Sequence, residues 1–138
     1  MRSLMMASAL AAFLSGAVWA QEVQAPNAGI ENTIRSQIDA FQQDDFGAAF
    51  EFAGPGIQNM FRTPENFGAM VRNGYPMVWR PEDLRFGDLR DIGGALWQKV
   101  IVQDGAGRTY VLDYRMGEYE DGWRIDGVQI LPAPEVNA

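Results

Sequence analysis

Cysteine and histidine are both absent from this 138-residue chain. Without cysteine the chain can form neither disulfides nor a lipid-modified cysteine anchor, so the folded protein depends on its hydrophobic core. The usual ligands of zinc, the commonest general base and the strongest nucleophile are missing as well. No spacing of acids indicates a carboxylate cage for another metal. We therefore expect no metal and no cofactor, and any catalysis would depend on Asp, Glu, Tyr and Arg.

A hydrophobic run long enough to cross a bilayer is missing from the first twenty residues, MRSLMMASALAAFLSGAVWA. The clean apolar run from Leu4 to Leu14 is shorter than the ~20 residues that a spanning helix needs. Arg2 precedes this run, and a small-x-small motif ends at Ala20. The pattern predicts a signal peptide over residues 1–20, cleaved after Ala20, and a periplasmic or secreted protein without stable membrane insertion. An uncleaved anchor is the alternative.

Positive charge is scarce, with 11 Lys and Arg against 18 Asp and Glu and a formal net charge of -7. Loss of Arg2 with the signal peptide would leave 10 against 18, a net charge of -8. Such an acidic protein repels phosphate backbones and anionic lipid head groups. We expect neither nucleic acid nor a membrane surface as a partner.

The remaining residues suffice for one hydrophobic core, since 47% of the chain is hydrophobic and 12% is aromatic. A chain of this size is typical of a single domain. We expect a flexible N-terminal segment over residues 21–27, one domain over residues 28–131, and a flexible, proline-broken tail over residues 132–138.

Helices are predicted in the first half, where apolar residues recur at helical spacing after residues that can cap a helix. GPG at 54–56 ends the second of them, and residues 57–61 suggest one more turn. The three helices cover residues 30–41 after Asn27, residues 46–53 after Asp44 or Asp45, and residues 64–74 after Thr63.

Strands are predicted in the second half, because the hydrophobic period changes to two after Pro76. Helices that precede a series of antiparallel strands indicate an α+β domain, with the helices covering one face of a curved sheet. The five strand candidates are residues 77–80, 84–90, 95–103, 109–116 and 123–131.

The hairpin turns predict a register for the last three strands. A tight turn at DGAG, pairing Asp104 with Gly107, sets Ile101 opposite Tyr110 and Trp97 opposite Tyr114. A second hairpin that pairs Met116 with Trp123 continues this apolar face onto the last strand, with Tyr114 opposite Ile125. The other face then has an apolar end and a polar end. At the polar end Asp113 lies opposite Asp126, and Arg115 lies opposite Arg124.

Four motifs in order carry a family resemblance. They are IRSQIDAF at 34–41, the acidic pair at 44 and 45, TPENFGAMV at 63–71 and DGWRIDGV at 121–128. Over residues 30–131 the chain resembles the nuclear-transport-factor-like superfamily, which has SnoaL-like, cystatin-like α+β folds. Within it, the order of motifs is similar to a bacterial family known only as domain of unknown function 4864.

The resemblance implies three N-terminal helices packed on a strongly curved antiparallel sheet of four to five strands. Such a cone often has a pocket at its wide end and often dimerises through the sheet. The superfamily contains isomerases, epoxide hydrolases, dehydratases and modules without activity, so the resemblance implies no single function.

The charged cluster Asp113, Arg115, Arg124 and Asp126 is the catalytic candidate. Two carboxylates directly opposite each other would resist joint ionisation, which raises the pKa of one until it can serve as an acid. The set has the residue types of the Asp-Arg-Asp group of limonene epoxide hydrolases. In this chain, however, Asp113 precedes Arg115, which reverses the order of these two residues associated with that family. A solvated charge ladder that stabilises the hairpin is the alternative interpretation.

Aromatic side chains are the candidates for ligand binding, because rings with polar atoms can line an apolar pocket. Packing in the core is the alternative for each of them. These residues are Tyr75, Trp79, Trp97, Tyr110 and Tyr114.

Three classes of function follow from these patterns. The first hypothesis is a non-catalytic module that binds a small apolar ligand in the cone. An isomerase- or hydrolase-like enzyme that uses the Asp/Arg cluster is the second. A structural or interaction protein that forms a homodimer through the half-apolar sheet face is the third.

Overall fold

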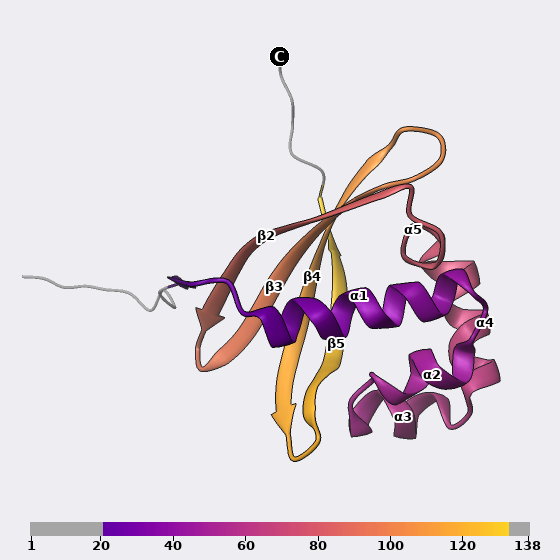
Figure 1. Ribbon diagram of the computed structural model, residues 1–138, viewed down its shortest axis with the longest axis horizontal. Coiled ribbons are helices and arrows are strands. Elements are labelled where there is room, and N and C mark those ends of the chain that lie inside the picture. The colour runs from indigo at the N-terminus through magenta and orange to yellow at the C-terminus, as the bar shows by residue number, and fades with distance from the viewer. Residues whose placement is uncertain (1–20, 133–138) are drawn as a thin grey trace, which may run out of the picture.

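The structure, a computed structural model, describes residues 21–132 and has an α+β fold (Figure 1). The predicted signal peptide and residues 133–138 of the predicted tail lie outside the described residues. Five strands pair antiparallel in the order β1-β2-β3-β4-β5, and the sheet is not closed. The described residues form β1 (Gln21–Gln24), α1 (Ala28–Gln42), α2 (Phe46–Glu51), α3 (Pro55–Phe61), α4 (Pro64–Gly74), α5 (Pro76–Trp79), β2 (Asp83–Ile92), β3 (Ala95–Gln103), β4 (Thr109–Tyr119) and β5 (Gly122–Leu131).

Three helices begin at the capping side chains that the sequence indicated. Asn27 accepts a hydrogen bond from the N–H of Ile30 at 3.0 Å, and Asp45 accepts one from the N–H of Ala48 at 3.1 Å. Thr63 caps α4 in the same way. Each cap satisfies a backbone donor that the first helical turn leaves free.

Three short segments differ from the prediction. The strand predicted at residues 77–80 is wrong, because Pro76–Trp79 form the single helical turn α5. Pro76 stands at the first position of this turn, where its fixed φ favours a helix, and four residues are too few for a period of two to be distinctive. The turn expected at residues 57–61 is part of a full helix, α3, which starts at Pro55. Strand β1, which pairs with β2, was not predicted.

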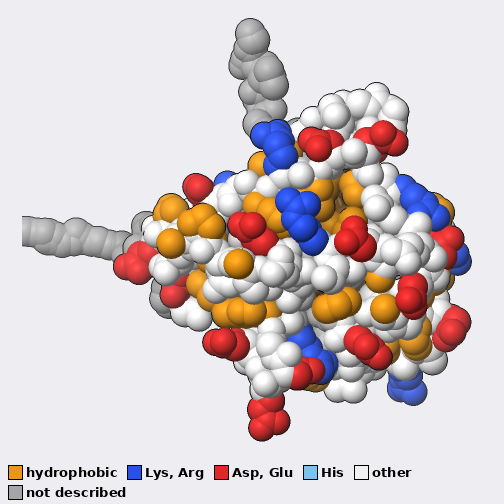
Figure 2. All heavy atoms as spheres, in the orientation of Figure 1, with side chains coloured by type: hydrophobic (Ala, Val, Ile, Leu, Met, Phe, Trp, Pro, Cys, Tyr) orange, Lys and Arg blue, Asp and Glu red, His pale blue; other side chains and the backbone are white. Residues whose placement is uncertain are grey.

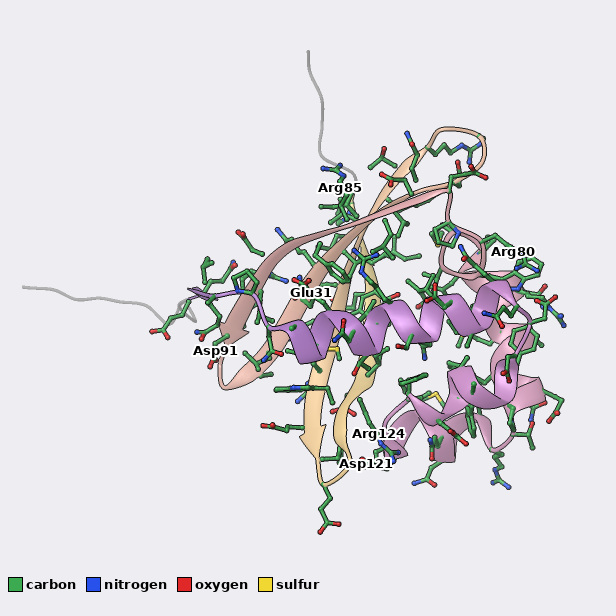
Figure 3. All side chains as sticks on the ribbon, in the orientation of Figure 1. Glu31, Arg80, Arg85, Asp91, Asp121 and Arg124 are labelled. Atoms are coloured by element: carbon green, nitrogen blue, oxygen red, sulfur yellow. The ribbon has the colours of Figure 1, made fainter. Side chains whose placement is uncertain are left out.

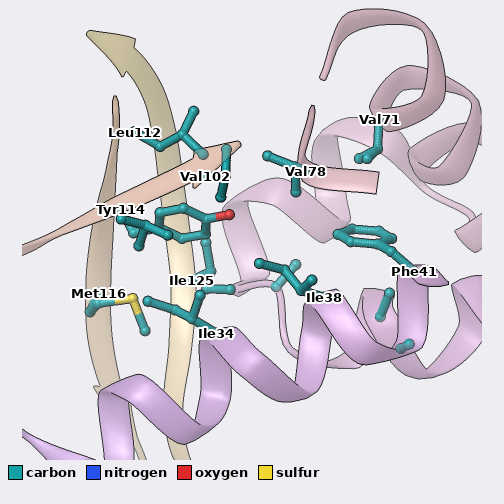
Figure 4. Close-up of a cluster of buried hydrophobic side chains, with 14 of the residues drawn as sticks. Ile34, Ile38, Phe41, Val71, Val78, Val102, Leu112, Tyr114, Met116 and Ile125 are labelled. Atoms are coloured by element: carbon teal, nitrogen blue, oxygen red, sulfur yellow. The ribbon is translucent and has the colours of Figure 1, made fainter. Parts of the chain in front are cut away.

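The helices pack on one face of the twisted sheet, with α1 crossing in front of the strands and α2 to α4 gathered at one end (Figure 1). We call this side the inner face of the sheet and the opposite side the outer face. Figure 4 shows the core that forms between α1 and the inner face. Its buried apolar residues are Ile30, Ile34, Ile38, Ala40, Phe41, Ala49, Ala53, Phe67, Val71, Met77, Val78, Leu89, Val100, Val102, Leu112, Tyr114, Met116 and Ile125.

The β3–β4 hairpin is one residue out of the predicted register. Asp104 pairs with Arg108 through the N–H of Asp104, so that three residues form the loop instead of two. Gly107 adopts a φ of +85°, which is typical of the last loop residue in such a turn. As a result Trp97 pairs with Arg115, and its side chain lies on the outer face.

The β4–β5 hairpin also differs from the predicted register, because a β-bulge interrupts it. Met116 pairs with Ile125 on one side of the bulge and Arg115 pairs with Gly127 on the other, which leaves Asp126 as the extra residue. The predicted pairs Asp113 with Asp126 and Arg115 with Arg124 are therefore wrong. A bulge bends its strand and redirects the side chain of the extra residue.

Candidate functional site

A cavity of about 280 Å³ lies between helices α3 and α4 and the inner face of strands β4 and β5. We call it the α3–β5 cavity. Its walls are mostly apolar, which is typical of sites for small organic molecules. Met60, 71% exposed, stands at its rim. The residues that line it are Gln37, Phe41, Ile57, Met60, Phe61, Phe67, Met70, Val71, Tyr75, Val78, Tyr114, Ile125, Asp126, Gly127 and Val128.

The linker between α2 and α3 fastens the helical wall of this cavity to the sheet. The N–H of Ile125 donates to the carbonyl of Phe52 at 2.8 Å, and the N–H of Gly54 donates to the carbonyl of Ile125 at 2.7 Å. These two bonds form a main-chain clip that fixes the start of α3 beside β5. The cavity is therefore built on the sheet as well as on the helices.

Tyr114 reaches the cavity from the middle of β4, and its side chain is completely buried. Figure 4 shows the ring on the sheet with its hydroxyl oxygen directed toward the helices. Among the described residues this hydroxyl has no hydrogen-bond partner. Burial, and to a lesser degree the neighbouring Tyr75, raises the pKa of Tyr114 above its usual value, so the hydroxyl stays protonated. A buried hydroxyl without a partner is costly, and it is well placed to bond a polar atom of a ligand.

Tyr75, between α4 and α5, brings a second hydroxyl to the same cavity. This hydroxyl lies 3.5 Å from the carbonyl oxygen of Val128, which makes a weak hydrogen bond at best. Gln37 adds an amide from α1, and its Nε2 donates to the carbonyl of Ala49 at 3.1 Å. The polar atoms of the cavity are therefore few and are spread over its apolar walls.

Asp126, the extra residue of the bulge in β5, lies at the edge of the cavity, and its carboxylate packs over Gly117 on the outer face of the sheet. The hydroxyl of Tyr119 donates to Oδ1 at 2.9 Å, and this bond is the main reason that the pKa of Tyr119 is raised. Gly54 and Gly117 lie against the two carboxylate oxygens so closely that a Cβ at either position would overlap with them. Two glycines and one hydroxyl thus fix the position of the carboxylate.

The other members of the predicted charged cluster lie elsewhere. Asp113 is buried on the outer face in an ion pair with Arg90 from β2. Arg115 is exposed, and Arg124 pairs with Asp121 at 2.5 Å in the β4–β5 turn (Figure 3). The structure does not bring the four residues of the cluster together.

Three of the predicted aromatic residues lie outside the α3–β5 cavity. Trp79 donates from Nε1 to Asp44 at 2.9 Å on the surface, and Trp97 is half-buried on the outer face. Tyr110 packs against the core and points its hydroxyl at Asp104, 3.4 Å away. Only Tyr75 and Tyr114 of the predicted set line the cavity.

Sequence reasoning missed most of the cavity wall. Ile57, Phe61, Phe67 and Met70 lie on the apolar sides of α3 and α4, and their spacing does not distinguish a core position from a cavity wall. Gln37 gave the one available signal, since an amide on the apolar face of a helix has to find a partner when it is buried.

The surface carries both signs of charge. On the face in Figure 2 acidic and basic side chains are intermixed, with hydrophobic side chains between them. Residues 21–132 contain no group of three or more His, Cys, Asp or Glu side chains that could hold a metal ion. Within the same range, every helix is too short or too polar to cross a bilayer.

Comparison with known proteins assigns the chain to a family. A family model described as a domain of unknown function, DUF4864, matches residues 23–138. No curated protein and no solved structure matches the chain. The chain belongs to the DUF4864 family.

Proposed function

We propose that this member of the DUF4864 family is a non-catalytic module that binds a small, mostly apolar molecule in the α3–β5 cavity. The observation that carries the proposal is the hydroxyl of Tyr114, which is completely buried beside the cavity without a partner among the described residues. A ligand that offers one polar atom to this hydroxyl and apolar surface to the walls would compensate its desolvation.

Two predictions from the sequence belong to the same proposal. The predicted signal peptide places binding in the periplasm or outside the cell. A distant relationship to the nuclear-transport-factor-like superfamily, with its cone-shaped fold, would agree with a cavity between helices and sheet. An enzyme that uses Asp113 with Asp126 is not proposed, because Asp113 lies opposite Gln129 and is buried in an ion pair with Arg90.

Filling the cavity tests the proposal. Ile57 is half-buried in the cavity wall, so Ile57→Trp would occupy part of the volume. The matched control is Ile130→Trp, because Ile130 is 45% exposed on β5 and lies outside the cavity. Binding of the neutral fluorophore 1-naphthylmethanol is measured by titration calorimetry for both variants and the wild type.

We expect Ile57→Trp to weaken binding by about tenfold or more, because steric exclusion removes well over 1.4 kcal/mol of contact. Ile130→Trp should leave the dissociation constant unchanged. Equal binding to all three proteins would show that the probe binds elsewhere, and this result would overturn the proposal. Native mass spectrometry of freshly purified protein gives a second readout, the mass of a molecule that co-purifies.

A homodimer through the outer face of the sheet is the second candidate. The observation that favours it is the partly apolar surface of that face, beside the Arg90–Asp113 ion pair that the chain itself buries. Half-buried Trp97 and Ile101 share this face. Light scattering should then give the mass of a dimer, and Trp97→Glu should reduce it to that of a monomer. A monomeric mass for the wild type at all concentrations would contradict this candidate.

A further inference from the structure

We propose that the ligand of the α3–β5 cavity is an uncharged molecule with a carbonyl oxygen, which accepts a hydrogen bond from the hydroxyl of Tyr114 while the rest of the molecule contacts the apolar walls. This inference rests on the proposed binding function and adds the chemical class of the ligand. It starts from a cavity wall that holds hydroxyl donors and directs no charged group at a ligand.

The charge of the wall lies outside the cavity. Of the residues that line the cavity, Asp126 alone is charged at neutral pH. Its carboxylate packs over Gly117 on the outer face and accepts a hydrogen bond from Tyr119, so it does not face a ligand in the cavity. A carboxylate or an ammonium group of a ligand would lose its hydration among apolar walls without gaining an opposite charge. The wall therefore favours an uncharged ligand over a fatty acid or an amine.

The polar group that faces the cavity is a donor that lacks an acceptor. The hydroxyl of Tyr114 is completely buried, points toward the helices (Figure 4) and has no hydrogen-bond partner among residues 21–132. Burial raises the pKa of Tyr114, so the hydroxyl keeps its proton. The partner that it lacks is an oxygen atom with a free lone pair. A carbonyl supplies that lone pair without bringing a second donor, which would need a partner of its own.

Tyr75 offers a second donor to the same oxygen atom. Its hydroxyl lies 3.5 Å from the carbonyl oxygen of Val128, and a bond of that length is weak enough to be replaced. The two rings are neighbours, since Tyr75 contributes to the raised pKa of Tyr114. A carbonyl oxygen has two lone pairs and can accept from both hydroxyls. This pair of donors distinguishes a ketone or an ester from a hydrocarbon of the same shape.

The test compares four probes that share the naphthalene ring: 1-acetylnaphthalene, 1-ethylnaphthalene, 1-naphthoic acid and 1-naphthylmethylamine. The ethyl compound has the shape of the ketone without its oxygen, and the acid and the amine are ionised at neutral pH. Equilibrium dialysis measures the affinity of each probe for the wild type, for Tyr114→Phe and for the matched control Tyr110→Phe. The control also removes one tyrosine hydroxyl, which points at Asp104 outside the cavity. Thermal melts confirm that both variants are folded.

We expect Tyr114→Phe to weaken binding of the ketone by about threefold to tenfold, which corresponds to the loss of one hydrogen bond. The same variant should leave the affinity for the ethyl compound within about twofold, because no bond is lost. Tyr110→Phe should leave all four affinities unchanged. The acid and the amine should bind the wild type about tenfold or more weakly than the ketone does, because neither finds an opposite charge in the cavity.

Two results would overturn the inference alone: equal weakening of the ketone and the ethyl compound by Tyr114→Phe, or binding of the acid or the amine to the wild type as tight as that of the ketone. Binding of the ketone that remains sensitive to Ile57→Trp would then still support the proposed function. Failure of all four probes to bind the wild type would overturn both.

Discussion

Removal of the hydroxyl of Tyr114 is predicted to stabilise the protein. In most buried tyrosines the change to phenylalanine loses a hydrogen bond and lowers the free energy of unfolding. In this protein the hydroxyl is completely buried and has no partner among residues 21–132, so Tyr114→Phe removes a desolvated polar group without breaking a bond. The direction of the effect is therefore opposite to the usual one.

The magnitude follows from the cost of an unsatisfied buried polar group, which is about 1–3 kcal/mol. The void left by one oxygen atom opens into the existing cavity, and this loss of contact offsets part of the gain. We expect a net increase of about 1 kcal/mol in the free energy of unfolding, equivalent to about 4 °C in the melting temperature of a domain of this size.

The assay is urea unfolding followed by circular dichroism, with Tyr119→Phe as the matched control. Tyr119 donates to Asp126 at 2.9 Å, so its variant should lose about 0.5–1.5 kcal/mol. The same pair of variants separates stability from binding. Tyr114→Phe should bind 1-naphthylmethanol about threefold to tenfold more weakly, because the ligand loses its hydrogen-bond partner.

A loss of 1 kcal/mol or more on Tyr114→Phe would refute the reasoning, since it would mean that the hydroxyl is bonded in the unliganded protein. Unchanged affinity for the alcohol would separately refute the role of this hydroxyl in binding.

Three further predictions concern other parts of the molecule. Arg90→Met leaves Asp113 buried without its partner and should lower the free energy of unfolding by about 3 kcal/mol in urea titrations; a loss below 1 kcal/mol would mean that the pair is not buried in solution. Gly117→Ala places a methyl group on the carboxylate of Asp126, so it should lower the free energy of unfolding by about 1–3 kcal/mol in urea titrations, whereas unchanged stability would contradict the close packing of Gly117 on that carboxylate. The hydrogen bond from the N–H of Arg108 lowers the pKa of Asp104 below its usual 3.8. The ionised Asp104 therefore stabilises the folded protein fully above pH 3.8, and this stabilisation is lost as the pH falls through the lower pKa of the folded state. Asp104→Asn should therefore make the melting temperature less sensitive to acid between about pH 5 and pH 2.5.

The elements that the sequence predicted correctly are those with local signals. The caps of α1, α2 and α4 act within one helical turn, so three residues suffice to identify them. The strands β2 to β5 likewise carry the period of two and the turn residues of hairpins. The order of helices before strands then indicated the α+β class.

The features that the sequence did not predict depend on strand register, which a single extra residue in a loop or a strand changes. One extra residue in the loop after Asp104 moved Trp97 from the expected cavity to the outer face. The bulge at Asp126 separated it from Asp113, although both residues were correctly placed on neighbouring strands. Tyr114 was a predicted binding residue that does line the cavity, but its lack of a partner is visible only in three dimensions.

The main-chain clip at Ile125 gives the two walls of the α3–β5 cavity unequal local stability. Amides on the strand side can exchange with solvent only when the sheet and the clip open together, which requires a large part of the fold to unfold. Helix α3 contributes no buried residue, so it can detach at a much lower free energy while its first residue stays tethered at Gly54. Brief fraying of this one short helix would therefore widen the access to the buried hydroxyl of Tyr114 without opening the sheet.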